Sequence, residues 1–175
     1  MSKLILPKTF VKDLNEPVIF LASPILSAPN WQDKAIMILF ELESNLIIVS
    51  PKRGSSPEIE KYIVSGDTSY FPRQRAWERH YLDVASKKGC ILFWLPGEEQ
   101  HNCQKVFGAM TRVEIGQWMT HYNLDNKVRF CIGTDGKFPE VNTIEFDLKL
   151  DAPDKIIHKT LEETCLNALK IATQK

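Results

Sequence analysis

Short apolar runs alternate with longer amphipathic segments along this chain. Mostly apolar runs at 17–22, 46–49, 90–95 and 127–133 have the length of single strands. An apolar run without alternation predicts a strand that is buried on both faces. We expect these four runs to form strands of one sheet, with 143–148 as a candidate fifth strand.

Helical spacing of apolar residues fills the segments between the predicted strands. It occurs at 30–44, 73–88 and 111–122, and again at 154–173, where Asp154 is the expected cap. Strands that alternate with helices form a mostly parallel sheet that is covered on both faces. The sequence therefore predicts an α/β fold with a mostly parallel five-stranded sheet, and a length of 175 residues suits a single domain over 1–175.

Charge and hydropathy exclude several classes of protein. The chain has 22 basic and 22 acidic residues and no basic run, so we do not expect nucleic acid as a partner. No stretch reaches the roughly 18 apolar residues of a membrane span, and Pro7 interrupts the only apolar run near the N-terminus. We expect a soluble, unexported, cytoplasmic protein that has no membrane partner.

Known cofactor and metal motifs are missing from the sequence. The four cysteines contain no CxxC pair, and the four histidines have no metal-ligand spacing. The chain also lacks GxGxxG, GxxxxGK[ST] and GxSxG motifs, so a standard dinucleotide site, a P-loop and a hydrolase nucleophile elbow have no support. We expect reduced thiols, no metal and no organic cofactor.

The remaining chemistry lies in the loops at the carboxyl ends of the strands, where parallel sheets bind ligands. Glu114 follows the third predicted strand and falls in the first turn of the next predicted helix, where the helix dipole favours an ionised carboxylate. Such a Glu can act as a nucleophile toward a sugar carbon, or it can simply stabilise the helix. Spacing alone does not decide between these two roles.

The loop after the first predicted strand offers groups that could bind a ligand. Ser23 and Pro24 allow close approach of a ligand, Asn30 caps the next helix, Trp31 can stack on a flat ring or belong to the core, and Gln32 can read the edge of a base. Further candidates are the cations Lys52 and Arg53 after the second predicted strand, and Glu78 near the start of the next predicted helix.

Taken in order, these segments resemble the nucleoside 2-deoxyribosyltransferase-like family. The resemblance covers about 17–133 and is carried by six motifs, at 19–24 (IFLASP), 28–32 (APNWQ), 50–53 (SPKR), 74–78 (QRAWE), 91–96 (ILFWLP) and 112–116 (RVEIG). It implies a flavodoxin-like, Rossmann-like three-layer fold. It also implies cleavage or transfer at the N-glycosidic bond of a nucleoside or nucleotide, with Glu114 as nucleophile and no cofactor. Relatives in this family assemble into homodimers or larger oligomers, so the resemblance implies a homo-oligomer here.

Two segments depart from the family pattern. Ser23 stands where relatives often have Gly, and Lys88 and Gly89 stand where many carry an Ala-Asp pair. The missing Asp removes a site carboxylate for which Asp83, Glu78 or Glu98 could substitute in space. A non-catalytic nucleotide-binding or sensing module and an interaction protein with a degenerate site therefore remain as alternatives.

Overall fold

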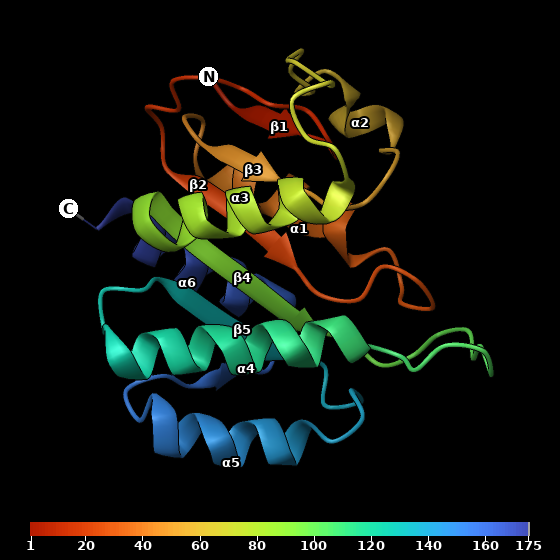
Figure 1. The fold of residues 1–175 in the computed structure, drawn as a ribbon, viewed down its shortest axis with the longest axis vertical. Coiled ribbons are helices and arrows are strands. Elements are labelled where there is room, and N and C mark those ends of the chain that lie inside the picture. The colour runs from red at the N-terminus through yellow and green to blue at the C-terminus, as the bar shows by residue number, and fades with distance from the viewer. Residues whose placement is uncertain (175) are drawn as a thin grey trace.

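The computed structural model describes residues 1–174 and contains one parallel sheet (Figure 1). Across the sheet the strands are ordered β1 (Lys3–Ile5), β3 (Ile47–Val49), β2 (Val18–Ala22), β4 (Gly89–Leu95), β5 (Phe130–Thr134) and β6 (Ile157–His158). The helices are α1 (Trp31–Leu42), α2 (Pro57–Glu60), α3 (Gln74–Lys88), α4 (Ala109–Leu124), α5 (Val141–Asp151) and α6 (Leu161–Thr173). The predicted α/β class is confirmed, with six strands in place of five.

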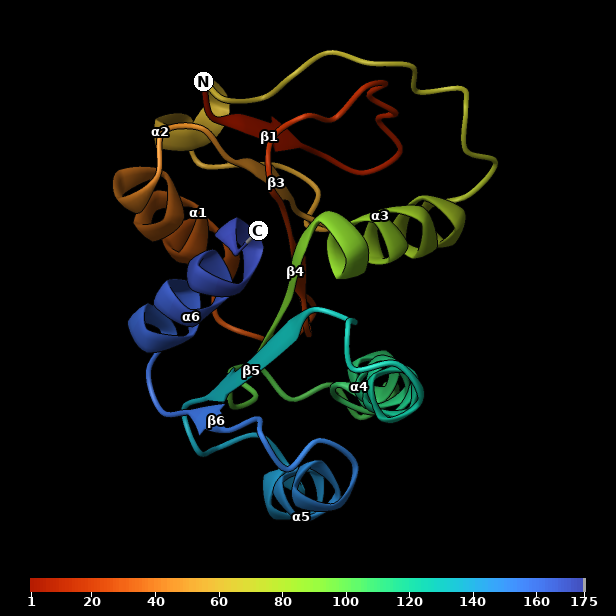
Figure 2. The same cartoon turned by 90° about the vertical axis from the view of Figure 1, so that its left-hand side faces the viewer.

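The helices cover both faces of the sheet and so give three layers. Figure 2 shows α1 and α6 on one face and α3, α4 and α5 on the other. Each face has its own apolar core, because the central strands are buried throughout and direct alternate side chains to opposite sides. Without β1, the strand order is that of flavodoxin, and the architecture is consistent with a flavodoxin-like fold.

Three predictions about the elements were wrong. Lys3–Ile5 adds β1 to the sheet edge, where no strand was predicted. The candidate strand at 143–148 lies in α5, where Ile144 and Leu148 are buried one helical turn apart and Phe146 is 62% exposed. The last helix begins only at Leu161, because 157–158 forms β6 and the Thr160 hydroxyl accepts the Glu163 N–H in its place.

The chain leaves neighbouring strands β2 and β4 toward opposite faces of the sheet. After β2 it enters α1 on one face, and after β4 it enters α4 on the other. In open α/β sheets the crevice at such a switch point is the usual ligand site. We therefore expect a ligand site at the carboxyl ends of these two strands.

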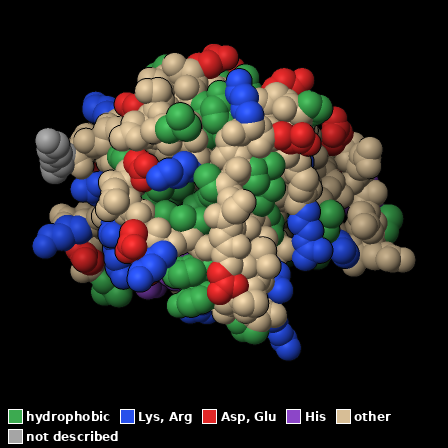
Figure 3. All heavy atoms as spheres, turned by 90° about the horizontal axis from the view of Figure 1, so that it is seen from above, with side chains coloured by type: hydrophobic (Ala, Val, Ile, Leu, Met, Phe, Trp, Pro, Cys, Tyr) green, Lys and Arg blue, Asp and Glu red, His purple; other side chains and the backbone are tan. Residues whose placement is uncertain are grey.

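Charges of both signs are mixed on the surface. Figure 3 shows acidic and basic side chains interspersed on the face near β1 and α2, with no continuous basic area in that view. Within residues 1–174, no helix is both long and apolar enough to cross a membrane.

Candidate active site

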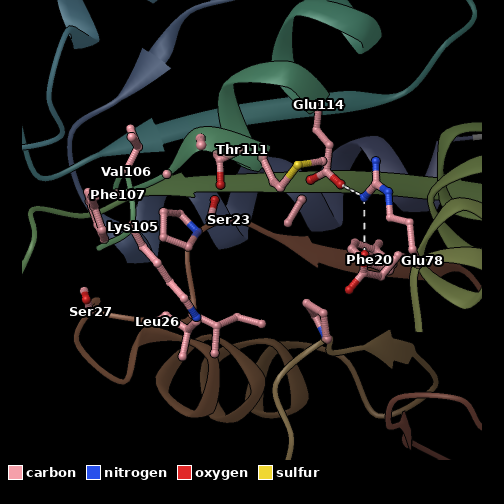
Figure 4. Close-up of a pocket in the computed structure, with 18 residues that line it drawn as sticks. Phe20, Ser23, Leu26, Ser27, Glu78, Lys105, Val106, Phe107, Thr111 and Glu114 are labelled. Atoms are coloured by element: carbon pink, nitrogen blue, oxygen red, sulfur yellow. Dashed lines mark hydrogen bonds and ion pairs between the residues drawn. The ribbon is translucent and has the colours of Figure 1, made fainter. Parts of the chain in front are cut away.

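A cavity of about 520 Å³ lies beyond the carboxyl end of β2, between α3 and the first turns of α4 (Figure 4). Its lining comes from β2 and the following loop, from α3, and from the segment that leads into α4. The residues are Phe20, Ala22, Ser23, Pro24, Ile25, Leu26, Ser27, Pro51, Arg75, Glu78, Lys105, Val106, Phe107, Gly108, Ala109, Met110, Thr111 and Glu114. Of the sequence-predicted site residues, the cavity brings together Ser23, Pro24, Glu78 and Glu114.

Glu114 lies in the wall of this cavity and is only 8% exposed. Because α4 begins at Ala109, Glu114 belongs to the second helical turn, and the prediction that it lies in the first turn was wrong. Arg75 on α3 donates from Nη1 to Oε1 of Glu114 (Figure 4). Burial raises the pKa of Glu114, the Arg75 ion pair opposes that rise, and the nearby charge of Glu78 adds to it.

Arg75 joins the two carboxylates of the cavity. Its Nη1 also contacts Oε2 of Glu78 at 3.3 Å, one turn along the same helix. Burial works against the charge of Arg75, but the pairs with Glu114 and Glu78 outweigh it and raise the pKa of the guanidinium. The result is a partly buried cluster of two carboxylates and one cation, with a formal charge of −1.

Hydrogen bonds from α3 and from the loop after β3 orient Glu78 within this cluster. Gln74 Nε2 donates to Glu78 Oε1 at 3.1 Å and to the carbonyl oxygen of Pro51 at 3.2 Å. Arg53 Nε donates in turn to Gln74 Oε1 at 3.0 Å. Glu78 is therefore oriented by its own helix and by the loop after β3.

Hydrogen bonds from β4 and α1 anchor the loop after β2. Ser23 Oγ accepts the backbone N–H of Trp94 at 2.8 Å, and the Pro24 carbonyl accepts Trp31 Nε1 at 3.0 Å and Gln32 Nε2 at 3.4 Å. Trp31 and Gln32 are almost fully buried and do not line the cavity. We predicted that these two side chains contact the base. In the structure their polar groups bond to the Pro24 carbonyl, so they hold the loop instead.

The remaining predicted binding residues pair with protein groups outside the cavity lining. Lys52 Nζ donates to Asn30 Oδ1 at 2.8 Å and lies 3.0 Å from Asp33 Oδ1. Arg53 is held by Gln74, as described above. Asn30, Lys52 and Arg53 therefore connect the loops around the site, and none of them lines it.

Of the three carboxylates that could replace the missing Asp, Glu78 alone lines this cavity. Asp83 pairs with Lys87 and lines a different hollow, and Glu98 pairs with His101. Among residues 1–174, no group of three or more His, Cys, Asp or Glu side chains could hold a metal ion.

The loop from 96 to 111 was expected at the crevice, but none of its residues was predicted to line the site, and neither was Arg75. Gly108 has a φ of +65°, and a Cβ there would lie 2.5 Å from the Phe138 ring, so the turn into α4 requires glycine. A glycine three residues before the predicted helix start at 111 was the available signal. Arg75 carried no comparable signal, because its importance arises only when α3 and α4 come together.

Comparisons with protein-family models, with curated proteins and with solved structures find no match for this chain.

Proposed function

We propose that the protein cleaves or transfers at the N-glycosidic bond of a nucleoside or nucleotide, with Glu114 as nucleophile. The observation that carries this proposal is a buried carboxylate in the wall of a cavity at the sheet's switch point, beside a second carboxylate. Both carboxylates contact the same guanidinium nitrogen, so they are close neighbours. Retaining glycosidases likewise place two carboxyl groups about 5–5.5 Å apart.

The chemistry follows from this arrangement. A Glu114 oxygen attacks the anomeric carbon, the bond from carbon to the base nitrogen breaks, and the base leaves with the electron pair and takes a proton from water. Water or a second base then attacks the same carbon, which restores the Glu114 carboxylate and gives net retention of configuration. The net negative charge of the cluster favours the positive charge that develops on the sugar.

Arg75 has a positioning role in this scheme. It holds Oε1 of Glu114, whereas Oε2 has no hydrogen-bond partner within residues 1–174 and is available for attack. When Glu114 forms an ester with the sugar, its charge disappears and Glu78 remains as the ionic partner of Arg75. The guanidinium therefore keeps a partner throughout the reaction.

The experiment that tests the proposal is base release by Glu114→Gln. The substitution keeps the shape of the side chain and a hydrogen-bonding oxygen, but it removes the nucleophile. We expect release to fall by about 10³-fold or more while the fold is retained. Full activity in the variant would overturn the assignment.

A non-catalytic nucleotide-binding module is the second candidate. The observation that favours it is the contact between Glu114 and Arg75 in the free protein, since a carboxylate already engaged by a guanidinium is a weaker nucleophile. Stoichiometric binding of a nucleotide that is recovered unchanged would select this function.

We also propose that the protein forms a homo-oligomer through the rim of the cavity. Leu26, Val106 and Met110 line the cavity and are exposed, so they place apolar surface at its mouth. Light scattering tests this directly, and a strict monomer would contradict it.

A further inference from the structure

A second hollow lies at the opposite edge of the sheet from the Glu114 cavity. It has a volume of about 630 Å³ and is lined by the C-terminal halves of α3 and α4 and by the loop from α4 to β5. Figure 1 shows both helices ending at this edge. Lys87 lies just before β4 and Arg129 just before β5, so the hollow lies at the amino ends of these strands. No residue lines both hollows.

Trp118 is a buried polar side chain without a partner in this second hollow. It is 6% exposed and lines the hollow, and its indole Nε1 has no hydrogen-bond partner within residues 1–174. The indoles of Trp31 and Trp77, by contrast, each donate to a backbone carbonyl oxygen at 3.0 Å. Burying a donor without an acceptor costs free energy, so a buried tryptophan usually has one. An unpaired indole N–H in the wall of a hollow is suited to an acceptor on a ligand.

Arg129 places a second unpaired donor group on the same hollow. Its side chain is half-buried, yet its guanidinium forms no ion pair in the described chain, and only its backbone N–H is bonded, to Ser86 O at 2.9 Å. Lys127 also lines the hollow and likewise has no ion-pair partner among residues 1–174. The side chains left without partners are therefore hydrogen-bond donors.

The two acidic residues of the lining already have partners. Asp83 pairs with Lys87 at 2.7 Å, and Asp125 Oδ1 accepts the backbone N–H of Lys127 at 3.1 Å. With Arg129, the lining has three cations against two carboxylates, a formal charge of +1. Cations complement the negative ends of helix dipoles, which accounts for Lys87 in the last turn of α3. Arg129 belongs to no helix, so this explanation does not extend to it.

We propose that this hollow binds a small organic carboxylate with a flat apolar body. A guanidinium matches the two oxygens of a carboxylate, and an indole N–H can donate to the same group. Trp118, Leu124 and Val128 give the lining an apolar part for the body of the ligand. A phosphate fits less well, because α3 and α4 both end here and the negative ends of their dipoles oppose a doubly charged anion more strongly.

The test is a ¹H–¹⁵N NMR titration of the indole N–H signals with benzoate, in which Trp118→Phe identifies the Trp118 signal. We expect benzoate to move this signal until it saturates. The signals of Trp31 and Trp77 should stay in place, because their N–H groups are already bonded within the protein. Benzamide has the same ring without the charge, and it should bind at least about tenfold more weakly, since one charge-assisted contact accounts for such a factor.

One variant assigns the preference for a carboxylate to this hollow. Arg129→Met removes the charge and keeps most of the aliphatic chain, and it should weaken benzoate binding at least about tenfold. Arg79→Met is the matched control, because Arg79 is exposed on α3 outside the lining, and it should leave the affinity unchanged. Benzoate binding that Arg129→Met leaves intact would overturn the site.

The other outcomes also decide the inference. A Trp118 signal that does not move at about 10 mM benzoate would overturn it, because even a Kd of about 1 mM gives nearly full occupancy there. Equal binding of benzamide would show an apolar hollow without a carboxylate site, and tighter binding of inorganic phosphate would show a different anion. Movement with protein concentration alone would show that a second copy of the chain fills the hollow. Base release enters none of these readouts, so the inference stands or falls separately from the proposed function.

Discussion

Replacing Arg75 by Met removes the only cation that contacts Glu114 in residues 1–174 and leaves two neighbouring carboxylates unpaired. Removing one partner of a fully buried pair costs about 3–5 kcal/mol. The Arg75 side chain is 36% exposed, so solvent screens the pair, and we expect a loss of about 1–2 kcal/mol in the free energy of unfolding at pH 8.

This loss depends on pH through Glu114. Burial already raises the pKa of Glu114 above its ordinary value of 4.5, and removing Arg75 raises it further. A carboxyl group whose pKa is higher in the folded state lowers the free energy of unfolding progressively as the pH rises from the unfolded pKa to the folded pKa. The penalty is complete above the folded pKa and absent below the unfolded value. The difference between the variant and the wild type should therefore shrink between pH 8 and pH 5.

Denaturant unfolding at both pH values measures the effect. Arg79→Met is the matched control, because Arg79 lies one turn further on α3, is exposed and forms no ion pair in the described structure. In a Glu114→Gln background, Arg75→Met should lower the free energy of unfolding by less than half of the amount that it does in the wild type. An equal loss at both pH values and in both backgrounds would show that Arg75 does not stabilise the fold through Glu114.

The remaining predictions concern the fold around the site. Trp31→Phe removes the indole donor to the Pro24 carbonyl and should lower the free energy of unfolding by about 1 kcal/mol, measured with denaturant; an unchanged midpoint would contradict the anchoring role. Gly133→Ala should cost about 1–3 kcal/mol, because the new Cβ would lie 1.8 Å from Thr164 Oγ1, and Thr164→Ala should restore part of the loss. A thiol reagent should modify one cysteine per native chain, Cys103, because the other three are buried; rapid modification of two would contradict this packing.

The sheet was largely predictable because its central strands bury both faces. Apolar runs identified β2, β3, β4 and β5 without ambiguity, whereas β1 is too short to give a signal of its own. The error at α5 has a clear cause: Ile144, Phe146 and Leu148 alternate with polar residues as in a strand. Only Ile144 and Leu148 are buried, so packing of one helical face overrode the apparent period of two.

The sequence pointed to two carboxylates that line the cavity, and to few of its other lining residues. Glu114 and Glu78 could be selected because each lies near the start of a helix that follows a strand or a loop at the crevice. Trp31 was assigned to the ligand because sequence does not reveal which way an indole N–H points. The role of Arg75 depends on the packing of α3 against α4, which no local pattern encodes.

The most direct measurement is base release from nucleosides and their monophosphates, with and without a second free base, by wild type and Glu114→Gln in parallel. We expect the variant to release base at least about 10³-fold more slowly than the wild type. Exchange in the presence of a second base would identify a transferase. Equal release by both proteins, or no release from any member of the panel by the wild type, would contradict the proposed reaction.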